Sequence, residues 1–213
     1  MILHGYFRSS AAWRVRIALA LKGLRAEDVF HHLRKGEQRS TEYLALNPQG
    51  FLPTLVLDDG TALTQSMAIV EYLDETVPTP PLMPAMPAER HEVRRLCAWF
   101  DDKFNIEVTR PILSERVWKK VMNAGYPDSR LVKSGLRAVK DHMDYLGHLL
   151  EHRKWLGGNM LTLADFTAAA HISCLDYISD VDWTHSTEVQ EWYAKIKSRP
   201  AFRSLLAELD TME

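Results

Sequence analysis

The chain has 213 residues, of which 25% are charged and 46% hydrophobic, and its formal net charge is −2. This length allows one large domain or two small ones, and the composition is that of an ordinary soluble protein. The slight charge argues against a general nucleic-acid binder, and two distant cysteines, Cys97 and Cys174, indicate neither a disulfide framework nor a cysteine zinc site.

The N-terminal residues Met1–Tyr6 show no signal-peptide pattern, and no apolar run approaches the roughly 18 residues of a membrane span. We therefore expect a cytoplasmic protein that does not enter a membrane.

Strand-like and helix-like segments alternate over residues 1–77. Gly23 is typical of a helix end, Pro48 disfavours a helical residue before it, and Asp59-Gly60 indicates a hairpin turn. The expected order is βαβαββα. The predicted segments are a strand at 2–6, a helix at 12–22, a strand at 27–32, a helix at 39–46, strands at 53–57 and 61–64, and a helix at 66–75.

Five prolines within residues 78–87 predict a stiff linker. The remainder, 88–213, shows helical apolar spacing and no strand pattern, so we predict an all-helical second domain. Its expected helices cover 90–105, 129–151, a segment that begins at Thr162, 187–198 and 200–209.

Ser9 and Ser10 lie where the first strand gives way to the first helix. A helix start presents unpaired N–H groups and the positive end of the dipole, so it favours anions. A serine there caps the helix or donates a hydrogen bond to an anionic ligand such as a thiolate. Position alone leaves both roles open.

Three further segments carry specific signals. Pro53 opens a strand and is a candidate cis residue, which would leave the Leu52 backbone free to pair with a peptide ligand. Gln65 and Ser66 stand at another helix start, a geometry that suits a carboxylate. Thr162-Leu163-Ala164-Asp165 is a capping box, for which we expect a structural role.

These segments together resemble the glutathione transferase superfamily, and most closely its zeta class, which includes maleylacetoacetate isomerases. The zeta pattern R-S-S-C-x-W-R-V-R-I-A-L-A-L-K-G is nearly matched by Arg8–Gly23, N-P-x-x-x-V-P-T-L by Asn47–Leu55, Q-S-L-A-I-I-E-Y-L by Gln65–Leu73, and G-Q-Q by Gly36–Gln38. The resemblance covers residues 2–83. It implies a thioredoxin-like first domain, an all-helical second domain and a homodimer.

The resemblance also implies a glutathione site. Ser9 or Ser10 would donate a hydrogen bond to the cysteinyl sulfur, and Gln38 would bind the glycyl end. A free thiol has a pKa of about 8.5, so stabilising the thiolate is what the chemistry needs at neutral pH.

The rest of the implied site holds the peptide. The Leu52 backbone, positioned by Pro53, would pair with the cysteinyl residue, and Gln65 and Ser66 would hold the γ-glutamyl carboxylate. We expect no metal, because the nine histidines form no recognisable metal set in the sequence; His142 and His148, for example, are six residues apart.

The chain departs from the zeta pattern in three places. Ala11 replaces the zeta cysteine, Asn105–Arg110 replaces a Q-P-L-Q-N-L run, and Tyr177 stands near the position of a substrate-binding arginine. Parts of the second domain instead resemble a bacterial branch with a member that binds the tubulin-like division polymer.

Two classes of function therefore remain. One is a glutathione-dependent enzyme that conjugates a small electrophile or isomerises a cis double bond of the maleylacetoacetate type, with Phe7 and Arg8 contributing to the electrophile pocket. The other is a non-catalytic interaction protein on the same fold, for which the bacterial division polymer is a candidate protein partner.

Overall fold

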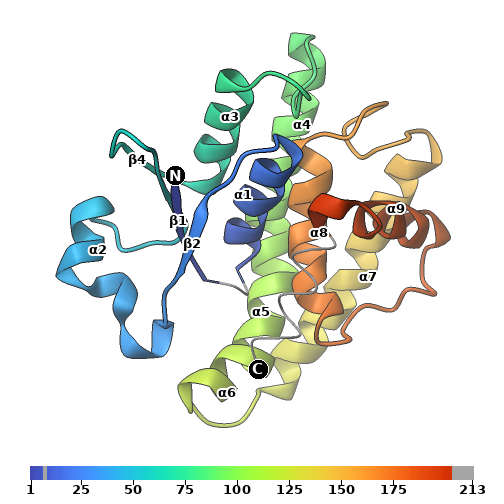
Figure 1. Cartoon of the computed structure of the whole chain (residues 1–213). Helices are drawn as coiled ribbons and strands as arrows, with labels where there is room; N and C mark the ends of the chain where they lie inside the picture. The colour runs from blue at the N-terminus through green and yellow to red at the C-terminus, as the bar shows by residue number, and fades with distance from the viewer. Residues whose placement is uncertain (7–8, 203–213) are drawn as a thin grey trace. The chain divides into compact units, whose positions relative to one another are not determined.

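The computed structural model describes residues 1–6 and 9–202, and the chain divides into two compact units (Figure 1). The first unit comprises Met1–Leu82 and the stretch that begins at Pro200; the second is Met83–Arg199. The predicted helix at 200–209 is described only as far as Phe202, and Phe7 and Arg8 also lie outside the described residues.

A four-stranded sheet in the order β2-β1-β3-β4 forms the centre of the first unit. β1 runs parallel to β2, with Ile2 opposite Glu27, and antiparallel to β3, with Ile2 opposite Val56. β3 and β4 form the predicted hairpin around Gly60, whose φ of 87° explains the glycine. The strands are β1 (Ile2–Gly5), β2 (Glu27–Phe30), β3 (Thr54–Val56) and β4 (Ala62–Thr64).

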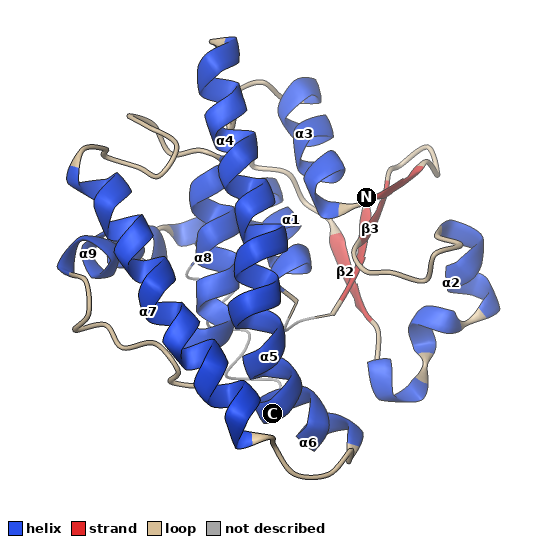
Figure 2. Cartoon of the chain, turned by 180° about the vertical axis from the view of Figure 1, so that it is seen from behind, coloured by secondary structure: helices blue, strands red, loops and turns tan. Residues whose placement is uncertain are grey.

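In the described part of Met1–Leu82, three α-helices and two short 3₁₀ turns accompany the sheet, and the predicted βαβαββα order is confirmed. α1 and α3 pack against each other, and α2 lies across the sheet from them (Figures 1 and 2). The helical elements are α1 (Ser10–Leu21), η1 (Leu33–Lys35), η2 (Glu37–Arg39), α2 (Thr41–Leu46) and α3 (Ser66–Thr76).

The buried ammonium of Lys22 ties the end of α1 to the end of α3. Its Nζ donates at 2.6 Å to a carboxylate oxygen of Asp74 and to the carbonyl oxygens of Val77 and Pro80. A buried charge is tolerated where its hydrogen-bonding capacity is filled. Three acceptors do so here, and they fix both helices at this end of the unit.

The second unit is helical. Its elements are α4 (Pro87–Trp99), η3 (Phe100–Thr109), α5 (Arg110–Leu113), η4 (Ser114–Trp118), α6 (Lys119–Met122), α7 (Ser129–Glu151), α8 (Leu163–Asp176) and α9 (Thr187–Lys197). The predicted helix at 129–151 is confirmed to the residue. Among the described residues, no helix has a stretch long and apolar enough to cross a membrane.

The predicted helix at 90–105 ends too early, because the chain stays helical from α4 through α6. Pro111 lies inside this run; it has no N–H, and its ring collides with the carbonyl of residue i−4 in a regular α-helix. The turns of η3, immediately before it, are widened to the π type. Widened π-type turns let a helix continue past a residue, such as a proline, that disturbs its regular hydrogen bonding.

α8 is the central helix of this unit, and residues 162–173 are all buried. It begins with the predicted capping box: the Asp165 carboxylate accepts from the Thr162 N–H at 2.9 Å. The same carboxylate accepts from the Leu156 N–H at 2.8 Å and from the Trp192 indole N–H at 3.0 Å. The structural role expected for this motif is confirmed. The motif also connects α8 to α9, because Trp192 belongs to α9.

Candidate functional site

Ser9 caps α1, and the same geometry leaves its proton available. Its Oγ accepts a hydrogen bond from the Ala12 N–H at 3.4 Å, while Ser10 is the first residue of the helix. Accepting that bond uses a lone pair of the hydroxyl and not its hydrogen. Capping the helix and donating to an anion are therefore compatible roles for Ser9. The first turn of α1 has no acidic residue to neutralise the helix dipole.

The start of α3 has an unusual backbone. Gln65 occupies the N-cap position with φ 67° and ψ 107°, and its side chain makes no capping hydrogen bond. Left-handed φ values are uncommon for residues other than glycine and gather at functional sites. The first turn of α3 also lacks an acidic residue, so its N–H groups present uncompensated positive charge.

The hydroxyl of Ser66 is oriented by a buried arginine. A guanidinium nitrogen of Arg14, which is 1% exposed, donates to Ser66 Oγ at 3.1 Å. Because the oxygen accepts from Arg14, the Ser66 proton is free to point to an acceptor at the start of α3. A guanidinium behind this hydroxyl also favours a negative ligand there.

The loop before β3 is held by buried side chains. Tyr43 Oη donates to the Phe51 carbonyl at 2.6 Å, and Asn47 Nδ2 donates to the same oxygen at 2.8 Å. Leu52–Pro53 is a cis peptide, as the sequence indicated. Neither the N–H nor the C=O of Leu52 has a hydrogen-bond partner in the described part of the chain. These two groups can pair with an extended peptide.

A small hollow of about 50 Å³ lies where this loop meets the starts of α1 and α3. About 10–15 Å³ of such space already holds one water molecule, so the hollow admits a small polar group of a peptide ligand. The hollow therefore suits one end of such a ligand. It is lined by Ala11, Asn47, Phe51, Leu52, Pro53, Gln65 and Ser66.

Gln38 lies beside the loop and not in the hollow. It belongs to η2, and a Cβ added to Gly50 would come within 3.1 Å of its backbone oxygen. Its side-chain Oε1 is buried and has no hydrogen-bond partner among the described residues. Gly50 has φ 66°, so the close approach and the backbone both require glycine there.

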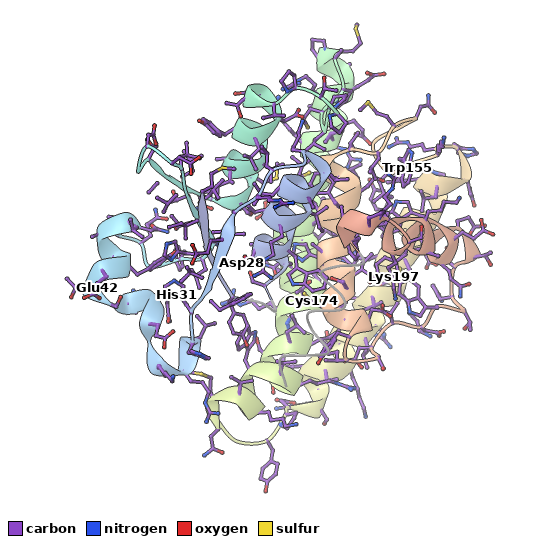
Figure 3. The ribbon with its side chains drawn as sticks, viewed as in Figure 1. Asp28, His31, Glu42, Trp155, Cys174 and Lys197 are labelled. Atoms are coloured by element: carbon purple, nitrogen blue, oxygen red, sulfur yellow. The ribbon has the colours of Figure 1, made fainter. Side chains whose placement is uncertain are left out.

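Two histidines pack against Tyr43, the side chain that holds this loop. His4 Nδ1 and His31 Nε2 are 3.0 Å apart, and the His31 and Tyr43 rings lie 4.6 Å apart between centroids (Figure 3 labels His31). Burial, followed by the charge of His31, lowers the pKa of His4, and burial lowers the pKa of His31. Burial therefore disfavours the charged form of both rings beside Tyr43.

The structure brings Leu52, Pro53, Gln65 and Ser66 around one hollow. Ser9, Ser10 and Gln38 do not line it, although Ala11, the next residue after Ser10, does. Sequence reasoning missed Asn47 and Phe51 as lining residues, and it did not connect Arg14 with Ser66. The Asn-Pro pair and an arginine within an Ala- and Leu-rich helix were the available signals.

Two family models match the chain. Residues 8–76 match the glutathione S-transferase N-terminal domain, and residues 128–208 match the glutathione S-transferase C-terminal domain.

Characterised relatives extend over nearly the whole chain. FtsZ-localized protein A of Caulobacter vibrioides is 40% identical, with 97% of this chain and 90% of the relative aligned. A probable maleylacetoacetate isomerase of Vibrio cholerae is 35% identical over 95% of this chain and 93% of the relative. A glutathione S-transferase structure from Rhodospirillum rubrum superposes with a TM-score of 0.91 at 47% identity, covering 96% of this chain and 90% of that one.

Proposed function

Because the chain belongs to the glutathione S-transferase superfamily, we propose that it is a zeta-like, glutathione-dependent enzyme with its glutathione site in the first unit. The observation that carries this proposal is the hollow at the start of α3, where an oriented hydroxyl and an uncapped helix end meet two unpaired backbone groups of Leu52. These features fit the carboxylate and the peptide backbone of a γ-glutamyl tripeptide.

Each predicted residue has a defined task in this proposal. Ser66 donates to the γ-glutamyl carboxylate and Gln65 contacts the same end, while the Leu52 backbone, positioned by Pro53, pairs with the cysteinyl residue. Gln38 contacts the glycyl end, and its buried, unpartnered Oε1 offers an acceptor for a ligand N–H.

Ser9, with Ser10 as the alternative, stabilises the sulfur. When bound, glutathione supplies a thiol whose ionised form attacks an electrophilic carbon. A hydroxyl donor at the start of α1 favours that ionised form, and the uncompensated helix dipole acts in the same direction. We propose conjugation or cis–trans isomerisation of a small electrophile of the maleylacetoacetate type as the reaction, and a homodimer as the assembled form.

Calorimetric titration with glutathione tests the binding proposal. We expect saturable binding that weakens roughly tenfold or more in Ser66→Ala, because a hydrogen bond to a charged group contributes about 1.5–3 kcal/mol. Ser66→Thr, which keeps a hydroxyl, should retain most of the affinity. Ser40→Ala is the matched control, since it removes a serine cap from α2. Absence of binding at millimolar glutathione would exclude the proposal.

The fate of glutathione separates the two reactions. An electrophile that is conjugated consumes glutathione in proportion to product, whereas an isomerised cis double bond gives the trans product with the thiol concentration unchanged. Measuring free thiol and product together on both kinds of substrate assigns the reaction.

A second candidate is a non-catalytic interaction role, favoured by the likeness to FtsZ-localized protein A along almost the whole chain. Co-sedimentation with FtsZ polymers in the absence of glutathione tests it. Retention of the chain in the polymer pellet, undiminished in Ser9→Ala and Ser66→Ala, supports this role. A chain that stays in the supernatant excludes it for that partner.

A further inference from the structure

The last turn of α7 gathers three side chains that suit a transition-metal ion. Ligand atoms of His148, Glu151 and His152 all lie within 4.8 Å of one another, and all three residues are exposed. We propose that these residues form a surface site for a divalent transition metal, represented below by zinc. This site is in the second unit, and the proposal is independent of glutathione binding.

The distances fit the coordination geometry. His148 Nδ1 lies 3.6 Å from Glu151 Oε2, and His152 Nε2 lies 3.9 Å from the same oxygen. With bonds of about 2.0–2.1 Å, two ligands of a tetrahedral zinc ion are roughly 3.3–3.4 Å apart. Small rotations of these exposed side chains would bring the observed separations of 3.6 and 3.9 Å to that value. Two imidazoles and one carboxylate leave a fourth position for water.

The spacing explains why these residues meet. His148 and His152 are four residues apart and Glu151 is three from His148, so the helix places them on one face. The expectation of no metal rested on pairs such as His142 and His148, six residues apart, and so missed this set.

The position at the C-terminal end of α7 favours a cation. Glu151 is the last residue of α7 and His152 is its C-cap, so the site lies at the negative end of a 23-residue helix dipole. The neighbouring Arg153 is already engaged, because it donates to a Glu92 carboxylate oxygen at 2.7 Å and to the Leu156 carbonyl at 2.9 Å.

The donor set also predicts selectivity. Imidazole nitrogens suit zinc, copper and nickel, whereas magnesium prefers oxygen ligands and retains its water. Zinc requires neutral imidazoles, so binding releases protons and weakens as the solution becomes acidic.

The test is calorimetric titration of the full chain, made without a polyhistidine tag, with zinc chloride. We expect one zinc per chain, with affinity at least about tenfold lower in His148→Ala and in His152→Ala, and no binding of magnesium. His91→Ala, which removes an exposed histidine of α4, is the matched control and should bind as the unmodified chain does.

Hydrogen exchange gives an independent readout. Zinc should slow exchange of the amides in the last turn of α7 in the unmodified chain, and not in His148→Ala. Zinc affinity equal in the unmodified chain and both histidine variants would overturn the proposal, as would a complete absence of zinc binding. Neither outcome bears on glutathione, whose site is tested by Ser66→Ala.

Discussion

Ser9 shows how one hydroxyl can serve folding and chemistry together. Its oxygen accepts from the Ala12 N–H, and its proton remains for a ligand. The sequence placed a serine at this helix start but presented capping and anion binding as alternatives. The structure shows the capping hydrogen bond. The proposed donation of the Ser9 proton to a thiolate is compatible with it, because it uses the other part of the hydroxyl.

Two substitutions separate these roles. Ser9→Ala should destabilise the fold by about 1 kcal/mol, since an N-cap is lost, and should also reduce thiolate formation in the glutathione complex. Ser9→Asp should keep the cap and the stability, because aspartate caps as well as serine does, while its charge opposes a nearby thiolate. Urea unfolding measures the first effect and the ultraviolet absorbance of the thiolate the second. If Ser9→Asp formed the thiolate normally, Ser9 would not be the donor.

His142 gives the second prediction at this scale. It is 3% exposed, and burial lowers its pKa, opposed by a 2.9 Å hydrogen bond to Glu107 Oε2. The folded chain therefore resists a proton that the unfolded chain binds near pH 6.5. The free energy of unfolding should fall as the pH drops below about 6.5, by up to about 1.4 kcal/mol for each unit by which the folded pKa is lowered.

Urea unfolding between pH 7.5 and pH 5.5, a range of about one unit either side of the ordinary histidine pKa, measures this slope. His142→Gln should show a shallower slope than the unmodified chain. Some slope remains, because the pKa values of His4 and His31 are lowered in the same sense. The exposed His91→Gln should keep the full slope. Equal slopes in His142→Gln and the unmodified chain would contradict the assignment.

Among the helices and strands, the ends that could be predicted from the sequence are those marked by residues within a few positions of them. Gly23, the Asn47-Pro48 pair and the Asp59-Gly60 turn each act within a few residues. The elements they delimit lie within two residues of the predicted bounds. The passage of the helix through Pro111 was not predictable in this way. It depends on widened turns in η3 and on packing against α7 and α8.

The candidate glutathione site also combines features that the local sequence indicates with features that only the folded unit produces. The cis bond at Pro53 and the helix start at Ser66 have local signals. The left-handed backbone of Gln65 has none, because glutamine does not favour positive φ and the surrounding structure must impose it. The bond from Arg14 to Ser66 joins residues 52 positions apart, so only the folded unit reveals it.

Packing between α5 and α7 gives a prediction at this scale. A Cβ added to Gly135 would lie 2.7 Å from Ile112 Cγ1. Gly135→Ala should therefore destabilise the chain by about 1–2 kcal/mol, because overpacking outweighs a gain of roughly 1 kcal/mol in helix propensity. Ser134→Ala, on the exposed side of the same helix, should change stability by less than about 0.5 kcal/mol. Thermal unfolding of both variants decides, and a stabilised Gly135→Ala would refute the close contact.

At the scale of the whole molecule, two relatives of different kinds match almost the full chain, one a probable maleylacetoacetate isomerase and one an FtsZ-localized protein. The serine motif and the hollow lie in the first unit, whereas the substitutions that depart from the zeta pattern at Asn105–Arg110 and Tyr177 lie in the second. The residues of the proposed glutathione site therefore lie in the first unit, and the departures that bear on the electrophile lie in the second.

The central claim is that the first unit binds glutathione and favours its thiolate. The most direct measurement is a pH titration of the thiolate absorbance of glutathione bound to the full chain. We expect the pKa of the bound thiol to lie well below the free value of about 8.5 and to move back toward it in Ser9→Ala. A bound thiol that titrates as free glutathione does would contradict the claim.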